Sequence, residues 1–196
     1  MGRKQVVRRP LESFRRLDRR LTRRAASWTS PWVRQVLPAV DSAAEGTKLW
    51  WGMAVLMAAT GGRTQRKAAA AGLLSMVIAQ VLSNAAGKQL LKRPRPPRQL
   101  IPHDDAEDRP DSSSFPSGHT AAAAGFTAAV AASSPWWAAA AGAVTAVVAL
   151  DRVHTGAHYP SDIAAGAAIG IASARLVHHA PRLLFHVVLW RARKVS

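Results

Sequence analysis

Long stretches without a charged residue alternate with short polar segments along this chain. Residues 68–87 are 20 consecutive uncharged residues, about the length that crosses a bilayer as a helix. Residues 120–150 form a second uncharged stretch of 31 residues, interrupted near its middle by the sequence SSP. Two shorter uncharged stretches lie at 49–62 and 163–174. The pattern predicts an all-α, polytopic membrane helix bundle with about five transmembrane helices, near 47–62, 67–91, 118–133, 135–150 and 161–177.

The segment 10–28 has a different pattern, typical of an amphipathic helix. Its apolar residues recur at helical spacing, and its arginines fall on the opposite arc. The apolar positions are Leu11, Phe14, Leu17, Leu21, Ala25 and Trp28. The pattern predicts an interfacial helix lying on an anionic membrane surface. The alternatives are a solvated basic tail or a partner-binding helix.

Prolines and charge divide the chain into three predicted parts. Residues 1–46 form a basic N-terminal segment, in which Pro31 and Pro38 are expected to interrupt the helical pattern. Residues 47–180 form the membrane domain. Pro181 is expected to end or kink the last helix, so that 181–196 form a basic tail.

Composition narrows the possible partners. The 196 residues carry a net charge of +16, which suggests a nucleic acid, an anionic membrane or a phosphorylated substrate. A soluble nucleic-acid binder does not need the uncharged stretches, so we expect a membrane protein and no nucleic acid. A soluble, alanine-rich helical bundle is the alternative. The chain has no cysteine, which excludes disulfides and thiolate metal sites.

The first polar loop, 92–117, follows a group of cations. Lys88 and Arg95 stand seven positions apart, and Lys92 and Arg93 lie between them. Cations at a helix end and in the adjacent loop can converge on a phosphate. Basic loops beside membrane helices are also common without any such role.

The same loop ends in the sequence FPSGHT, residues 115–120. The N–H groups at the start of the following helix, Gly118 among them, attract an anion. Ser117 adds a hydroxyl, and His119 could carry a proton to a leaving oxygen. The simpler alternative is a capped helix start with an incidental histidine.

The second loop, 151–160, holds two histidines. Arg152 can hold a phosphate, and His154 and His158 are both possible nucleophiles. Pro160 suits the first turn of a helix that begins near residue 161, which places Asp162 near His158, where a carboxylate can orient an imidazole. We expect His154 to make a structural hydrogen bond instead.

Together these pieces resemble the three-part signature of the type 2 phosphatidic acid phosphatase superfamily. The pieces are Lys88–six residues–Arg95-Pro96, then Pro116-Ser117-Gly118-His119, then Arg152–five residues–His158–three residues–Asp162. The resemblance covers about residues 47–177. One position departs from it: Asp151 stands where the family commonly has serine. A carboxylate there is expected to weaken phosphate binding or to pair with a neighbouring cation.

The resemblance implies a mechanism without a metal or cofactor. In it, His158 attacks phosphorus and forms a phosphohistidine, Asp162 orients His158, and His119 protonates the leaving oxygen. The phosphate is held by Lys88, Arg95, Ser117, the Gly118 N–H and Arg152.

These observations predict an integral membrane phosphatase acting on a lipid phosphate or diphosphate, of the phosphatidic acid or polyprenyl diphosphate type. A non-enzymatic, membrane-anchored binder of anionic lipid or nucleic acid is the alternative, and a vanadate-binding haloperoxidase is disfavoured by the membrane helices. The acidic run 103–111 is expected to be a solvated loop, since it lacks regular metal-ligand spacing.

The multi-pass chain is expected in the cell membrane. Five spans put the N-terminal arginines and the site on one face, which the positive-inside rule places in the cytoplasm. A sixth span or a re-entrant stretch at 28–46 would reverse this orientation.

Overall fold

The regular secondary structure of the described part of the chain is entirely helical. This computed structural model describes residues 3–87, 92–103 and 112–195, with side chains for 12–85, 92–103 and 112–180. The helices are α1 (Arg3–Ala26), α2 (Pro31–Ala44), η1 (Glu45–Thr47), α3 (Lys48–Thr60), α4 (Arg63–Val81), the π-helical turn η2 (Leu82–Gly87), η3 (Arg98–Leu100), α6 (Gly118–Ala131), α7 (Pro135–His154) and α8 (Pro160–Val195). The predicted all-α class is confirmed.

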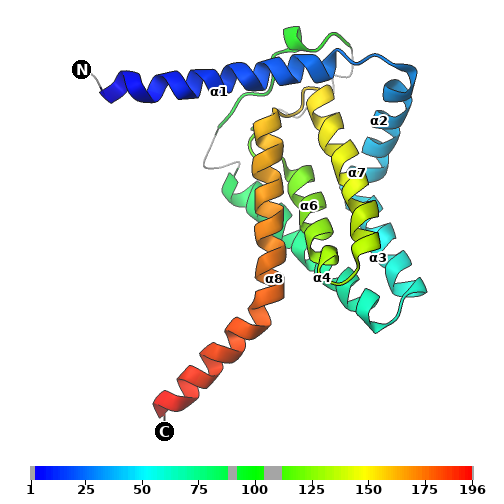
Figure 1. Cartoon of the computed structure of the whole chain (residues 1–196), viewed down its shortest axis with the longest axis vertical. Helices are drawn as coiled ribbons and strands as arrows, with labels where there is room; N and C mark the ends of the chain where they lie inside the picture. The colour runs from blue at the N-terminus through cyan, green and yellow to red at the C-terminus, as the bar shows by residue number, and fades with distance from the viewer. Residues whose placement is uncertain (1–2, 88–91, 104–111, 196) are drawn as a thin grey trace.

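Helix α6 occupies the middle of the bundle. It packs against α4, α7 and α8, while α3 packs on α4 and α2 on α7. Figure 1 shows α2 and α3 following one another along the bundle, and α1 lying crosswise over one end. The segments that join α4 to α6 and α7 to α8 lie at that same end, so the two polar loops and the basic helix are neighbours.

Three helices are long and apolar enough to cross a membrane alone: Arg63–Ala85, Pro135–His154 and Pro160–Ala180. The other two predicted spans correspond to α3, with 13 residues, and α6, with 14. At about 1.5 Å per residue, helices of this length fall short of a hydrocarbon core of about 30 Å. Helix α6 tolerates its short length because other helices, rather than lipid, surround it: nine of its residues are buried.

Two proline predictions need correction or refinement. The helical pattern is interrupted before Pro31, as expected, because α1 ends at Ala26 and Pro31 begins α2. Proline is favourable at that position because the first helical turn needs no N–H from it. Pro38 does not interrupt the pattern, since it lies inside α2. Residues 31–44 therefore form a helix of the bundle, continued by α3 after a break at Gly46 and Thr47, which both have positive φ. Near Pro181, α8 bends but continues to Val195, so the expected end or kink takes the form of a kink.

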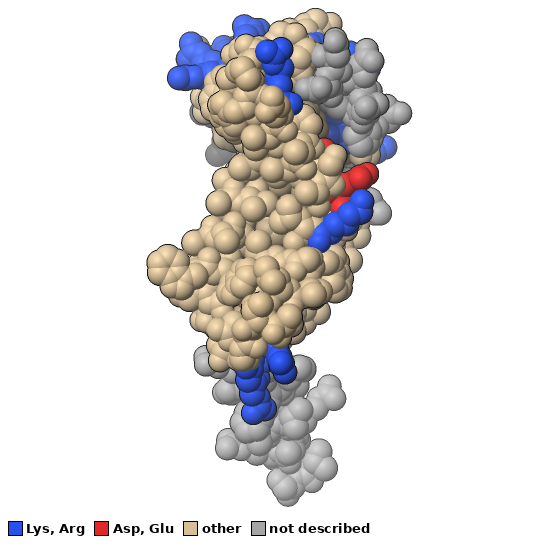
Figure 2. All heavy atoms as spheres, turned by 90° about the vertical axis from the view of Figure 1, so that its right-hand side faces the viewer, with Lys and Arg blue, Asp and Glu red and all other residues tan. Residues whose placement is uncertain are grey.

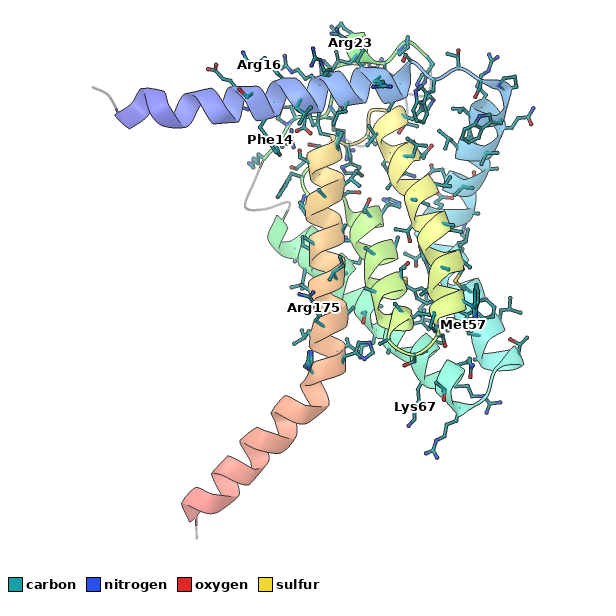
Figure 3. All side chains as sticks on the ribbon, in the orientation of Figure 1. Phe14, Arg16, Arg23, Met57, Lys67 and Arg175 are labelled. Carbon is teal, nitrogen blue, oxygen red and sulfur yellow. The ribbon has the colours of Figure 1, made fainter. Side chains whose placement is uncertain are left out.

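Charged side chains of the described residues gather mainly toward two ends of the bundle. Figure 2 shows Lys and Arg at the α1 end, a smaller basic group toward the opposite end, and between them a largely uncharged surface with one acidic and basic group at its edge. Figure 3 places Lys67 at that opposite end. An exposed ion pair of Glu45 and Lys48, 3.7 Å apart, marks the break between α2 and α3. This distribution suits a protein whose middle lies in lipid.

Glycines allow α8 to approach α6 closely. Gly166 and Gly170 are four residues apart, so they lie on one face of α8. A Cβ atom at Gly166 would collide with the carbonyl oxygen of Ser117, and one at Gly170 would lie 2.5 Å from the carbonyl oxygen of Ala121. Small residues permit such backbone contact between membrane helices. The first of these contacts supports the residues that begin α6 and carry the sequence PSGH.

We expect Gly166→Ala to destabilise the protein by about 1–3 kcal/mol, because the added methyl overpacks the α6–α8 contact. Gly52→Ala is the matched control, since nothing lies within 4 Å of a Cβ at that position of α3. It should be neutral or stabilising, as alanine is the better helix former by about 1 kcal/mol. Thermal unfolding in detergent measures both. Equal melting temperatures for the two variants would contradict the close contact.

Candidate active site

Main-chain hydrogen bonds join the three sequence motifs. Ser114 N donates to the Arg93 carbonyl at 3.0 Å, Ser117 N to the Asp162 carbonyl at 3.1 Å, and His158 N to the Arg152 carbonyl at 2.9 Å. The loop after α7 is compact because Gly156 takes a positive φ of 67°, which glycine adopts without steric cost. Segments distant in sequence are therefore held at fixed distances from one another.

A cavity of about 200 Å³ opens where these motifs meet. Its walls include five of the eight residues predicted for the site: Arg95, Gly118, His119, Arg152 and His158. Residues from other elements complete the wall, namely Gly46, Thr47, Gln80, Asn84, Ser112, Ala122 and Ala157. The cavity therefore combines two cations, two imidazoles and a helix N-terminus, which together suit a phosphate group.

Of the two imidazoles in the cavity, that of His158 is held more firmly. Its side chain is buried, and its Nδ1 atom donates to the carbonyl oxygen of Ser114 at 2.6 Å. This bond leaves the lone pair on Nε2. Burial lowers the pKa of His158 to about 3, against the hydrogen bond to Ser114, and the charges of Arg95 and Arg152 add to the lowering. The imidazole is therefore neutral at physiological pH, as a nucleophile must be.

Asp162 supports His158 through an intermediate residue. The sequence interpretation placed its carboxylate against His158, but the structure places it against other groups. Its Oδ2 accepts from the Tyr159 N–H at 2.9 Å and its Oδ1 contacts Arg93 at 2.6 Å. The Ser114 side chain is another hydrogen-bond partner. Because Ser114 also supplies the carbonyl that holds His158, the carboxylate orients the imidazole indirectly.

Arg93 connects this carboxylate to the N-terminal helix. Its guanidinium bonds Asp162 on one side and Asp18 of α1 on the other, at 2.7 Å, and lies 4.2 Å from the centre of the Tyr159 ring. Burial alone would lower the pKa of Arg93, but the hydrogen bond to Asp18 and the two carboxylate charges outweigh it and raise the pKa. Arg93 therefore stays charged between two buried carboxylates.

Asp18 also caps helix α8. Its Oδ1 accepts from the Ser161 N–H at 3.1 Å, and its Oδ2 accepts from the Ser161 hydroxyl at 2.6 Å. A carboxylate at a helix N-terminus satisfies an otherwise unpaired N–H and interacts favourably with the helix dipole. The contact joins α1 to the first turn of the helix that carries Asp162.

The two arginines of the cavity are held by different partners. Arg95 donates to the Ala157 carbonyl at 2.6 Å and to the Ser112 carbonyl at 3.2 Å. Arg152 forms an ion pair with Asp41 of α2, and its Nε lies 3.6 Å from Asp151. The unusual Asp151 thus lies beside a neighbouring cation, which was one of its two expected effects. Both carboxylates partly compensate the charge of Arg152.

The remaining predicted residues occupy varied positions. His119 is exposed and lines the cavity. The Ser117 hydroxyl instead caps α6, accepting from Thr120 N at 3.4 Å and lying 3.0 Å from the Thr120 hydroxyl. Lys88 lies outside the described residues. His154 makes the expected structural hydrogen bond, but its partner is the Ala25 carbonyl of α1, at 2.9 Å.

The acidic run at 103–111 is described only at its first residue. The His103 ring stacks on the His154 ring, with 4.4 Å between centroids. Residues 104–111 lie outside the described part of the chain, so the expected solvated loop stays a prediction. Among the described residues, no three His, Asp or Glu side chains are grouped as metal ligands.

Sequence reasoning missed three residues around the site. Asp18 and Asp41 lie in α1 and α2, far along the chain from their partners Arg93 and Arg152, and no local motif marks them. Ser114 contributes mainly through its backbone carbonyl, which any residue type carries. The sequence indicates Arg93 only as one of several basic residues near Arg95.

Comparison with known proteins gives the family. A sequence model of the PAP2 superfamily matches residues 68–185, more than half of the chain. The chain therefore belongs to the PAP2 superfamily, as its motifs indicate. Membership makes it a phosphatase, an enzyme that hydrolyses phosphate esters. The alternative interpretation as a non-enzymatic binder is not supported.

Two solved structures share the fold. LpxE of Aquifex aeolicus is 22% identical with a TM-score of 0.63, over 81% of this chain and 92% of that one. A transmembrane PAP2-type phosphatidylglycerolphosphate phosphatase from Bacillus subtilis is 20% identical with a TM-score of 0.62, over 87% of each chain. No curated protein sequence matched the chain. The shared fold confirms the membrane helix bundle.

Proposed function

We propose that this protein is a multi-pass phosphatase of the cell membrane that hydrolyses a lipid phosphate or diphosphate through a phosphohistidine on His158, without a metal ion. The observation that carries the proposal is the cavity lined by His158, His119, Arg95 and Arg152. Residues 47–180 form its catalytic membrane domain.

The geometry supports a two-step reaction. In the first step Nε2 of His158 attacks phosphorus, the bond from phosphorus to the leaving oxygen breaks, and His119 gives that oxygen a proton. In the second step water attacks the phosphohistidine, His119 takes the water proton, and phosphate leaves with His158 restored. Arg95, Arg152 and the Gly118 N–H stabilise the charge on the phosphoryl oxygens.

A lipid substrate fits the position of the cavity. The motif loops that line it lie at one end of an apolar helix bundle, so a phosphate can enter while its lipid tail stays beside the helices. The B. subtilis relative is named for a lipid phosphate. A lipid whose phosphate headgroup binds at the end of the helix bundle agrees with the position of the cavity and with the name of that protein.

The orientation of α1 supports attachment to the membrane surface. Phe14, Leu17 and Leu21 lie on one face of α1 and are between 41% and 56% exposed, although this helix crosses the end of the bundle (Figure 1). A helix with such an exposed apolar row and many arginines suits the headgroup layer of an anionic membrane. The positive-inside rule then puts α1 and the site on the cytoplasmic side.

Phosphate release from a panel of lipid phosphates and diphosphates tests this function. We expect the purified protein in detergent to release phosphate from at least one of these lipids, and the rate to be unchanged by EDTA. Enzyme quenched in alkaline denaturant should carry phosphate on His158 that is stable in alkali and released by acid. Loss of activity in EDTA would contradict the metal-free reaction. No release from any lipid by folded protein would contradict the substrate class.

A further inference from the structure

A second cavity lies between α1 and the catalytic loops. Its volume is about 400 Å³, twice that of the catalytic cavity, and it shares none of the described lining residues with it. Helix α1 supplies one wall, and the segments around Lys92 and Phe115 supply the other. The reaction proposed above makes no use of this cavity.

Positively charged side chains line the second cavity. Arg15, Arg19 and Lys92 line it, and no carboxylate is recorded against any of them within the part of the chain that the structure describes. Arg93 also lines it, but Asp18 and Asp162 already compensate that charge. The described lining residues include no carboxylate of their own. Three cations with no carboxylate partner among the described residues favour an anionic ligand.

Aromatic and apolar side chains form the rest of the wall. Phe14, Phe115, Tyr159 and Pro94 line the cavity beside the cations. Figure 3 shows Phe14 pointing from α1 toward the bundle, whereas Arg16 and Arg23 point away from it. Phe14 also begins the exposed apolar row of α1, so the cavity opens where that helix meets the lipid headgroups. A ligand with a phosphate and an apolar part matches both halves of the wall.

We propose that this second cavity binds the phosphodiester headgroup of an anionic phospholipid that the enzyme does not hydrolyse. The proposal rests on the proposed function, because it requires α1 to lie at the membrane surface. The bound headgroup would neutralise Arg15, Arg19 and Lys92. It would also hold α1 against the catalytic loops, next to the contact of Asp18 with Arg93.

The test compares two double variants of α1 with equal charge. Full-length protein in neutral detergent is titrated with phosphatidylglycerol, a phosphodiester, and bound lipids are counted by native mass spectrometry. We expect Arg15→Gln with Arg19→Gln to weaken binding about tenfold, since two headgroup contacts are lost. Arg16→Gln with Arg23→Gln removes the same charge from the outer face and should change the affinity less than about twofold.

Three outcomes would overturn the proposal. Equal losses in the two double variants would show diffuse surface attraction in place of a site. Unchanged binding in the first double variant would show that the cavity takes no headgroup. Displacement of the lipid by an equal concentration of inorganic phosphate would show that the site takes free phosphate. Because this assay needs no turnover, its failure is distinguishable from failure of the phosphatase function.

Discussion

Replacing His158 with alanine should abolish phosphate release, lowering kcat by at least about four orders of magnitude, as loss of a covalent nucleophile does. The side chain lines the catalytic cavity, and the Ser114 carbonyl holds its Nδ1 atom, which leaves Nε2 available for the attack. The measurement is steady-state release of phosphate from the best substrate of the lipid panel. The variant should also form no acid-labile phosphoenzyme.

His179→Ala is the matched control for this loss. His179 is exposed on α8, remote from the cavity walls, and its removal should leave kcat unchanged. The wild-type pH profile gives a second readout. Because the pKa of His158 is lowered to about 3, its protonation should cost no activity until the pH approaches that value. Phosphoenzyme formation by His158→Ala would contradict its role as nucleophile.

Removing the charge of Asp18 should lower kcat about 10- to 100-fold, although this residue lies in the N-terminal helix outside the cavity. Losses of this size are typical when a group that orients a ligand or a reacting side chain is removed. Asp18→Asn would lose the ion pair with Arg93, which in turn holds Asp162. Asp162 and Ser114 would then hold His158 less firmly. The KM should change little, because Arg95 and Arg152 keep their own partners.

Asp18→Glu and Glu12→Gln separate positioning from attachment of α1. The first keeps the charge and should recover part of kcat. The second removes an exposed carboxylate from the same helix and should have no effect on kcat. If Asp18→Asn lowered the melting temperature but left kcat unchanged, Asp18 would only hold α1 in place. Equal effects of Asp18→Asn and Glu12→Gln would exclude a specific ion pair.

Much of the site could be predicted from short motifs, because spacing along one segment fixes which residues share a loop. The sequence PSGH predicted a helix start, and Gly118 begins α6 as expected. His158 and Arg152 share one compact loop, and both reach the cavity. The partners of these residues could not be predicted in the same way. Ser117 was expected to bind phosphate, yet its hydroxyl is used as the cap of α6.

Helix α1 shows where a local pattern is insufficient. Its arginines and apolar residues predicted an amphipathic helix, and the helix is present. The face that docks on the bundle, however, includes the buried polar residues Asp18 and Thr22, while Phe14 and Leu17 stay exposed. Periodicity ranks faces by hydrophobicity. It does not detect one carboxylate that is buried because a distant arginine and a helix N-terminus pair with it.

The sequence by itself determined the membrane helices and their order, the phosphatase class, and five residues that line the cavity. These properties depend on the length of uncharged stretches and on short motifs, both of which can be recognised within one continuous segment of the chain. Only the tertiary structure decided how these residues are held. Asp18 meets Arg93 and Asp41 meets Arg152 because the bundle brings α1 and α2 against the catalytic loops. The cavity behind Arg93 likewise exists only after α1 has docked, since its two walls are far apart along the chain.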